Sequence, residues 1–310
     1  MKDLDLAALQ CLAALADEGN FERAAQRLNI TQSAVSQRLR ALEAQVGQLL
    51  VIRTRPLRLT EQGKLLLRLA RQIQALSSDV ARELGLQQTA MERLPIAVNA
   101  DSLATWVLPA LDGLVQQGLQ AGYGLELVVD DQDFTHDWLR QGAVLGCVST
   151  VREALRGCLV QPLGVMRYIA VASPALIAGR FPEGLTPVNF SQLPFLVFNR
   201  KDDTQVQWVS RAFGLRAPTL QERYVPSSEA YVHAVQMGWG IGVAPELQVR
   251  PLLASGALVA LRPEVTLDVA LFWHQWKLLP DSVAQEPGVA LLTEVGRALA
   301  DGARRALAQE

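Results

Sequence analysis

The stretch that decides the fold of this chain runs from residue 20 to residue 63 and reads NFERAAQRLNITQSAVSQRLRALEAQVGQLLVIRTRPLRLTEQG. It contains two helical segments, residues 21–28 and 32–47, with only the turn residues Asn29 and Ile30 and the N-cap candidate Thr31 between them. Asn20 and Thr31 stand just before these segments, where their side-chain oxygens can accept hydrogen bonds from the free amides of a first helical turn. Two helices joined by so short a turn predict a helix-turn-helix.

Each of the two predicted helices has an apolar side that can be buried. Ala24, Ala25 and Leu28 form it in the first helix, and Val35 and Leu39 form it in the second. The side chains left outside the second helix suit a helix that enters the major groove of DNA. They are Gln32, Ser33, Ser36, Gln37 and Arg40, while Arg38 and Arg40 can hold phosphates at the groove edge.

A basic turn follows the second helix in the segment VIRTRPLRLTEQG, residues 51–63. Two short apolar strands flank a turn that carries Arg53, Arg55 and Arg58, which predicts a wing that reaches the adjacent minor groove or its phosphates. Between residues 20 and 75, ten basic and three acidic residues give a net charge of +7, although the whole chain carries −2. A basic segment on an otherwise acidic chain favours contact with phosphates over a merely solvated surface.

One long helix is predicted from residue 60 to residue 85. Apolar residues recur in it at steps of three and four, as in the seam of a coiled coil: Leu66, Leu69, Ile73, Leu76 and Val80. Such a stripe can also pack on its own chain. Because it lies between two domains and has no obvious intramolecular partner, we expect it to mediate dimerisation.

The region from residue 94 to about residue 300 alternates strands and helices. LPIAVNA, PFLVFN and VALFWHQW are typical of its predicted strands. The alternation predicts an α/β fold with mostly parallel sheets. A break near Tyr168 predicts two subdomains with a cleft between them.

Three marks in the N-terminal segment are specific in combination. They are A-A-x-x-L at residues 24–28, T-Q-S-A-V-S-x-x-L-x-x-L-E at residues 31–43, and L-T-x-x-G at residues 59–63. With them the segment resembles the N-terminal domain of LysR-type transcriptional regulators, although Val51 and Ile52 replace the usual phenylalanine before the wing arginine. The resemblance implies that the polar side chains of the second helix face bases, namely Thr31, Gln32, Ser33, Ser36 and Gln37.

The resemblance continues to near the C-terminus and implies a domain organisation. We expect a winged helix-turn-helix over residues 1–59, a linker helix over residues 60–91, and an effector domain over residues 92–310. The effector domain would have the α/β fold of a type 2 periplasmic binding protein, with subdomain I at about 94–167 and 266–300 and subdomain II at about 168–265. The glycine-rich MGWGIGVAPE at residues 237–246 matches the family's turn and strand, and it fits a dinucleotide-binding loop poorly because it enters a strand.

Three further segments look like one branch of this family: VNADSLATWVLPAL (98–111), LRQGAVLGCVS (139–149) and SSEAYV (227–232). The branch comprises arginine- and lysine-responsive regulators of basic amino acid export, also described as inhibitors of chromosome replication initiation. Gly146 stands where most LysR-type proteins have an aspartate, as in this branch. The implied partners are double-stranded promoter DNA, L-lysine or L-arginine, RNA polymerase, and further copies of the chain in a dimer or tetramer.

Candidate effector contacts lie where predicted strands end, because ligands bind at such edges of open α/β sheets. Hydroxyls and amides there suit the carboxylate of a free amino acid, and carboxylates suit a lysine or arginine side chain. The candidates are Asn99, Asp101, Ser102, Asp131, Ser149, Thr150, Asp203, Ser228 and Glu229. Helix capping would also explain Asp101, and which of the acids faces the cleft stays open.

Several other classes of protein are disfavoured. No apolar run approaches the ~18–20 residues of a membrane span, and the acidic start MKDLDLAALQ is unlike a signal peptide, so we expect a cytoplasmic protein without a membrane partner. The sequence has no G-x-S-x-G motif and no metal-ligand spacing of cysteine or histidine, so we expect neither a catalytic residue nor a metal or other cofactor. Two alternatives stay open: the same architecture with a different small effector, and an architectural DNA protein at replication origins.

Overall fold

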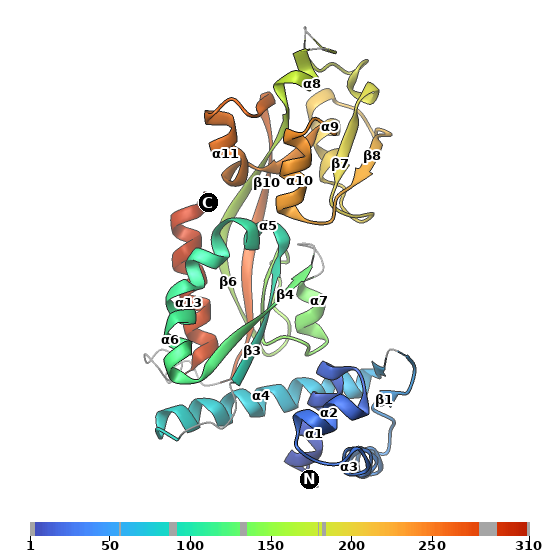
Figure 1. Ribbon diagram of the computed structural model, residues 1–310, viewed down its shortest axis with the longest axis vertical. Helices are drawn as coiled ribbons and strands as arrows, with labels where there is room; N and C mark the ends of the chain where they lie inside the picture. Colours follow the sequence, from blue (N-terminus) through green and yellow to red (C-terminus); the bar gives the residue numbers. More distant parts are fainter. Residues whose placement is uncertain are drawn as a thin grey trace.

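The computed structural model describes residues 4–55, 57–86, 92–130, 135–178, 180–181, 184–278 and 290–308. Figure 1 shows an N-terminal domain of short helices, a long helix α4 that passes beneath the C-terminal domain, and a tall C-terminal domain. Two long strands, β6 and β10, run through the height of the C-terminal domain and connect its lower and upper halves. Within the described residues, no helix is both long and apolar enough to span a lipid bilayer.

The N-terminal domain consists of α1 (Leu6–Glu18), α2 (Phe21–Arg27), α3 (Gln32–Val46) and a hairpin of β1 (Val51–Ile52) and β2 (Arg58–Leu59). The two predicted N-caps are present. The side chain of Asn20 accepts from the Arg23 amide at 2.8 Å, and that of Thr31 accepts from the Ala34 amide at 3.2 Å. Asn29 has φ 52°, a conformation that asparagine tolerates better than most residues, and it permits the tight turn between α2 and α3.

The linker helix α4 (Glu61–Glu83) packs against the N-terminal domain of its own chain. Leu66 is buried in the core of that domain, and Leu69 and Ile73 pack against the same core. The prediction that the apolar stripe lacks an intramolecular partner is therefore wrong for these three residues. Val80 is 53% exposed, and Leu65 on the same helix and Leu84, its C-cap, are also exposed.

A six-stranded sheet forms the centre of the C-terminal domain, in the order β4-β3-β5-β10-β6-β9. Its strands are β3 (Glu92–Asn99), β4 (Tyr123–Asp130), β5 (Gly146–Ser149), β6 (Cys158–Ala172), β9 (Gly242–Pro245) and β10 (Val259–Trp276). β3 runs parallel to β4 and β5, but β10 is antiparallel to β5 and β6, and β6 is antiparallel to β9. The expectation of mostly parallel sheets is thus wrong for the middle of the sheet, because β6 leaves subdomain I in one direction and β10 returns in the other.

Helices cover the sheet in both subdomains (Figure 1). Subdomain I contains α5 (Ala100–Ser102), a π-helical turn (Leu103–Val107), α6 (Leu108–Ala121), α7 (Thr135–Arg140) and α13 (Leu291–Ala306). Subdomain II contains α8 (Pro174–Ala178), a 3-10 turn (Phe190–Gln192), α9 (Thr204–Phe213), α10 (Ser228–Gln236), α11 (Glu246–Ala254) and the parallel strands β7 (Pro194–Val197) and β8 (Gln221–Tyr224). A bridge between Phe195 and Ile241 joins β7 to the residue before β9.

Gly63, in the first turn of α4, touches the backbone that leads into the wing. A Cβ at this position would lie 2.1 Å from the carbonyl oxygen of Leu50. Because backbone cannot move aside without shifting the wing, we expect Gly63→Ala to destabilise the N-terminal domain by about 1 to 3 kcal/mol, measured by thermal or urea unfolding.

Gly113→Ala is the matched control for this substitution. Gly113 also lies inside a helix, α6, and an added Cβ would meet no atom within 4 Å. This change should be neutral or stabilise the protein by up to about 1 kcal/mol. Equal stabilities of the Gly63→Ala variant and the wild type would contradict the close contact with Leu50.

Candidate functional site

A cavity of about 490 Å³, its mouth included, lies between the two subdomains. It forms where β3, β7 and β9 end, beside the middle of β6. Residues of both subdomains line it: Asn99, Ala100, Asp101, Tyr168, Phe198, Asp202, Thr204, Gln205, Ser228, Tyr231, Val243, Ala244, Pro245 and Gln248. A cavity of this size suits a small molecule such as a free amino acid.

Asp101 joins the two sides of this cavity. Its carboxylate accepts one hydrogen bond from the hydroxyl of Tyr168 at 2.8 Å and another from the hydroxyl of Ser228 at 2.6 Å. Asp101 follows β3 in subdomain I, whereas Ser228 begins α10 in subdomain II. Burial raises the pKa of the Asp101 carboxyl, the two hydrogen bonds lower it, and the nearby negative charge of Asp202 raises it.

Asp202 fixes the loop that leads into α9. Its carboxylate accepts from the backbone amides of Phe198 and Thr204, both at 3.0 Å, and from the Gln205 side-chain amide at 3.1 Å. The same amide of Gln205 also donates to the Tyr231 hydroxyl at 3.2 Å. These bonds place a second carboxylate at the cavity wall in a fixed orientation.

The cavity wall is rich in hydrogen-bond acceptors. Besides the carboxylates of Asp101 and Asp202, the side-chain oxygens of Asn99 and Gln205 are buried and have no hydrogen-bond partner among the described residues. No lysine or arginine belongs to the described residues that line the cavity. Because an unpaired buried acceptor costs about 1 to 3 kcal/mol, a ligand with several N–H donors and a positive charge is favoured here.

The structure brings three of the predicted effector residues to this cavity, namely Asn99, Asp101 and Ser228. The others lie elsewhere. Ser102 is buried next to Asp101 but does not line the cavity, and neither does Ser149, the last residue of β5, nor Thr150, which follows it. Asp203 is exposed and bonds the Gln207 side chain at 2.7 Å, Glu229 is exposed on α10, and Asp131 lies outside the described residues.

Several residues that line the cavity have no recognisable signal in the sequence. The pattern marks Tyr168 only as a break between subdomains, and it favours Asp203 over its neighbour Asp202. Gln205, Tyr231 and Gln248 lie inside helices, where no local signal distinguishes a residue that faces a cleft from one in a core.

A second candidate surface is formed by α3 and the wing. Figure 1 shows α3 on the side of the N-terminal domain that faces away from the C-terminal domain. The predicted base-reading residues Thr31, Gln32, Ser33 and Gln37 are exposed, and Ser36 is half-buried. The hydroxyl of Ser36 accepts a hydrogen bond from the Arg40 guanidinium at 3.0 Å, so these two side chains lie together on the helix surface.

The arginines predicted to contact phosphates are in two situations. Arg40, Arg53, Arg55 and Arg58 are exposed, and the guanidinium of Arg53 lies 5.2 Å from the centre of the Phe21 ring. Arg38 is half-buried beside the thiol of Cys11; burial raises the pKa of this thiol and the Arg38 hydrogen bond and charge lower it. Arg38 is therefore less free to reach a phosphate than the other arginines.

Two family models match the chain. Residues 6–64 match the bacterial regulatory helix-turn-helix protein of the lysR family, and residues 87–286 match the LysR substrate binding domain. The first covers the surface formed by α3 and the wing. The second covers the residues of the cavity between the subdomains.

Individual proteins similar to this chain agree with the family models. The HTH-type transcriptional regulator ArgP of Aeromonas salmonicida is 44% identical over 97% of this chain and 100% of its own length. The crystal structure of ArgP from Mycobacterium tuberculosis covers 99% of this chain and 100% of its own, with 37% identity and a TM-score of 0.82. Full-length LysG from Corynebacterium glutamicum with bound effector Arg covers 98% of this chain and 99% of its own, with 34% identity and a TM-score of 0.72.

Proposed function

The chain belongs to the LysR family of bacterial helix-turn-helix transcriptional regulators, and from this premise we propose that free L-lysine or L-arginine controls its binding to promoter DNA. The observation that carries the proposal is the acceptor-rich cavity around Asp101 and Asp202, which has no lysine or arginine among its described lining residues. The arginine bound by LysG, a relative that matches nearly the whole chain, supports the same class of ligand.

The polar groups of the cavity suit the two ends of a basic amino acid. The ammonium or guanidinium of the side chain would contact the carboxylate of Asp101 and the unpaired oxygens beside it. The α-carboxylate would lie near Ser228, the first residue of α10, because amides at a helix N-terminus favour negative charge.

Calorimetric titration of the full chain with four compounds tests this proposal. L-lysine and L-arginine should bind, whereas norleucine and citrulline, which have similar shapes but no side-chain charge, should bind at least about tenfold more weakly. No heat with lysine or arginine, together with clear binding of another amino acid, would favour the alternative of a different effector. DNA affinity that does not respond to any amino acid would favour an architectural role at replication origins.

On the DNA side, we propose that α3 enters the major groove and that the wing contacts the neighbouring phosphates. Arg53, Arg55 and Arg58 are exposed on or beside the hairpin, in a segment of net charge +7. We also propose dimers through the exposed apolar side chains of α4 and its C-cap, including Leu65, Val80 and Leu84, and further pairing to tetramers. Two or more winged helices would then bind successive half-sites, bend the promoter and affect RNA polymerase.

Salt dependence provides a test of the wing contact. Arg53→Ala should weaken promoter binding at low salt and reduce the slope of log K against log[salt] by about one unit, because one fewer counterion is released. Fluorescence anisotropy at a series of salt concentrations measures this slope. Arg216→Ala, at an exposed position in subdomain II, is the control and should leave the slope unchanged. Equal slopes for Arg53→Ala and wild type would exclude a phosphate contact at Arg53.

A further inference from the structure

The linker helix α4 belongs to the cores of both domains. Leu66, Leu67 and Ala70 are buried in the core of the N-terminal domain, whereas Ala75, one turn later, is buried in the core of the C-terminal domain. Farther along α4, the carboxylate of Asp79 accepts from the backbone amide of Leu291 in the C-terminal domain at 3.2 Å. The two domains therefore meet on α4 around residues 68–75, where the guanidinium of Arg68 also lies 4.7 Å from the centre of the Trp276 ring.

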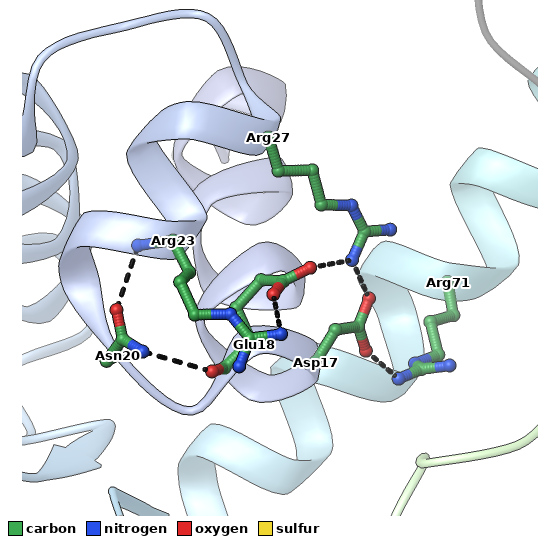
Figure 2. Close-up of polar contacts among 6 residues, drawn as sticks. All are labelled: Asp17, Glu18, Asn20, Arg23, Arg27 and Arg71. Atoms are coloured by element: carbon green, nitrogen blue, oxygen red, sulfur yellow. Dashed lines mark hydrogen bonds and ion pairs between the residues drawn. The ribbon is translucent and has the colours of Figure 1, made fainter.

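A network of ion pairs lies at this meeting point, as Figure 2 shows. Asp17, in the last turn of α1, accepts from Arg27 of α2 and from Arg71 of α4, each at 2.5 Å. The Arg71 side chain is only 13% exposed, and its Nε has no hydrogen-bond partner among the described residues. One aspartate thus ties the two helices before the DNA-reading helix to the linker helix.

The C-terminal domain contributes charges to the same place. A cavity of about 400 Å³ is lined by Asp17, Arg27 and Arg71 on one side and by Arg93 and Glu126 on the other. Burial lowers the pKa of Arg71, and the negative charges of Asp17 and Glu126 raise it. The guanidinium of Arg71 therefore pairs with Asp17, and Glu126 of the C-terminal domain adds a negative charge to the same cavity.

The strand β3 connects this cavity with the ligand cavity. Arg93 and Pro95, near its beginning, line the cavity at the junction, and Asn99, its last residue, lines the ligand cavity next to Asp101. At about 3.3 Å per residue, the two cavities are separated by only a few residues of one paired strand.

We infer that Arg71 couples the two domains: its charge, paired with Asp17 and lining the same cavity as Glu126, fixes the orientation of the DNA-reading domain on the effector domain. A charged interface that encloses a cavity can change its arrangement, whereas a close-packed apolar interface resists change. Occupation of the ligand cavity is thereby transmitted to the orientation of α3 and the wing. The inference rests on the proposed function for its ligand, but the charge network itself is independent of that ligand.

The test compares Arg71→Met with Arg23→Met in the full chain. Arg23 pairs with Glu18 in the same network but does not reach α4, and its side chain is 66% exposed. Promoter affinity is measured by anisotropy with and without L-arginine, and L-arginine binding is measured by calorimetry. Wild type and Arg23→Met should show the same ratio of DNA affinities with and without the ligand. In Arg71→Met this ratio should fall to within about twofold of one, a loss of the usual 5- to 150-fold coupling, with ligand binding unchanged.

Glu126→Gln removes a negative charge from the same cavity at an exposed position of the C-terminal domain. This variant provides the test if Arg71→Met does not fold. It should also reduce the ratio. A wild-type ratio retained in both variants would overturn the inference. If the wild type binds neither lysine nor arginine, the proposed function is wrong, but the role of Arg71 at the junction can still be tested by hydrogen exchange. Arg71→Met should then speed exchange in the last turn of α1 and the first residues of β3, and unchanged exchange would overturn the inference.

Discussion

Asp101→Asn is expected to lower the affinity for L-lysine or L-arginine by about 2 to 5 kcal/mol, which is about 30- to 5,000-fold. The asparagine keeps the shape of the side chain and can still bond Tyr168 and Ser228, so the cavity should persist. The substitution removes the negative charge of the buried carboxylate. The cationic side chain of the ligand, which has lost its hydration water in the cavity, then has no carboxylate to pair with at this position. Calorimetry with both amino acids measures the decrease in affinity.

Asp203, an acid outside the cavity, supplies the control for this prediction. Asp203→Asn removes a carboxylate that is exposed and bonds Gln207 outside the cavity, so it should change the affinity by less than about twofold. If Asp203→Asn weakened binding as much as Asp101→Asn, the ligand would have to lie outside the cavity around Asp101.

The pH dependence of binding separates charge from shape at Asp101. Burial holds the pKa of this carboxyl above its ordinary value, and a bound cation favours the ionised form. Affinity should therefore decrease as the pH falls through this raised pKa, with proton release on binding at pH values around it. The asparagine variant should lack this component, because it has no proton to release. Titrations in two buffers of different ionisation enthalpy measure the released protons.

The N-terminal domain can be predicted from sequence because the signals that form it are local. The caps at Asn20 and Thr31 bond amides three residues away, and the burial of Val35 and Leu39 follows from helical spacing alone. The wing depends on a turn of a few residues. None of these features requires knowledge of what the rest of the chain does.

The ligand cavity can be predicted only in part because it depends on contacts between distant segments. Asn99, Asp101 and Ser228 are recognisable because they stand where a strand meets a helix or a helix begins. Tyr168 bonds Asp101 across 67 positions of sequence, which is a consequence of how β6 crosses between subdomains. No pattern within either segment contains that information.

Two adjacent acids show that the sequence also fails to predict which of two neighbouring residues lines the cavity. Asp202 and Asp203 are chemically identical, and sequence reasoning selects Asp203. In the structure, the carboxylate of Asp202 accepts from the amides of Phe198 and Thr204 and lines the cavity. Which acid faces inward is decided by the turn between β7 and α9, and this turn has no signal of its own in the sequence.

The second large predicted effect is a loss of promoter affinity on substitution in the DNA-reading helix α3. Ser33→Ala combined with Ser36→Ala is expected to weaken binding to the specific promoter by about 1 to 3 kcal/mol for each hydrogen bond to a base that the change removes. Ser33 is exposed at the start of α3, and Ser36 holds Arg40 in place, so the double change removes two hydroxyls and releases one guanidinium. Non-specific binding should change little, because it depends on the phosphate contacts of the wing.

Anisotropy with promoter and scrambled DNA measures both affinities, and Ser255→Ala in the effector domain serves as the control. Because Thr31 still caps α3 and Val35 and Leu39 remain buried, the fold should be intact by thermal unfolding. Promoter affinity equal to that of wild type would mean that α3 does not read bases through these hydroxyls.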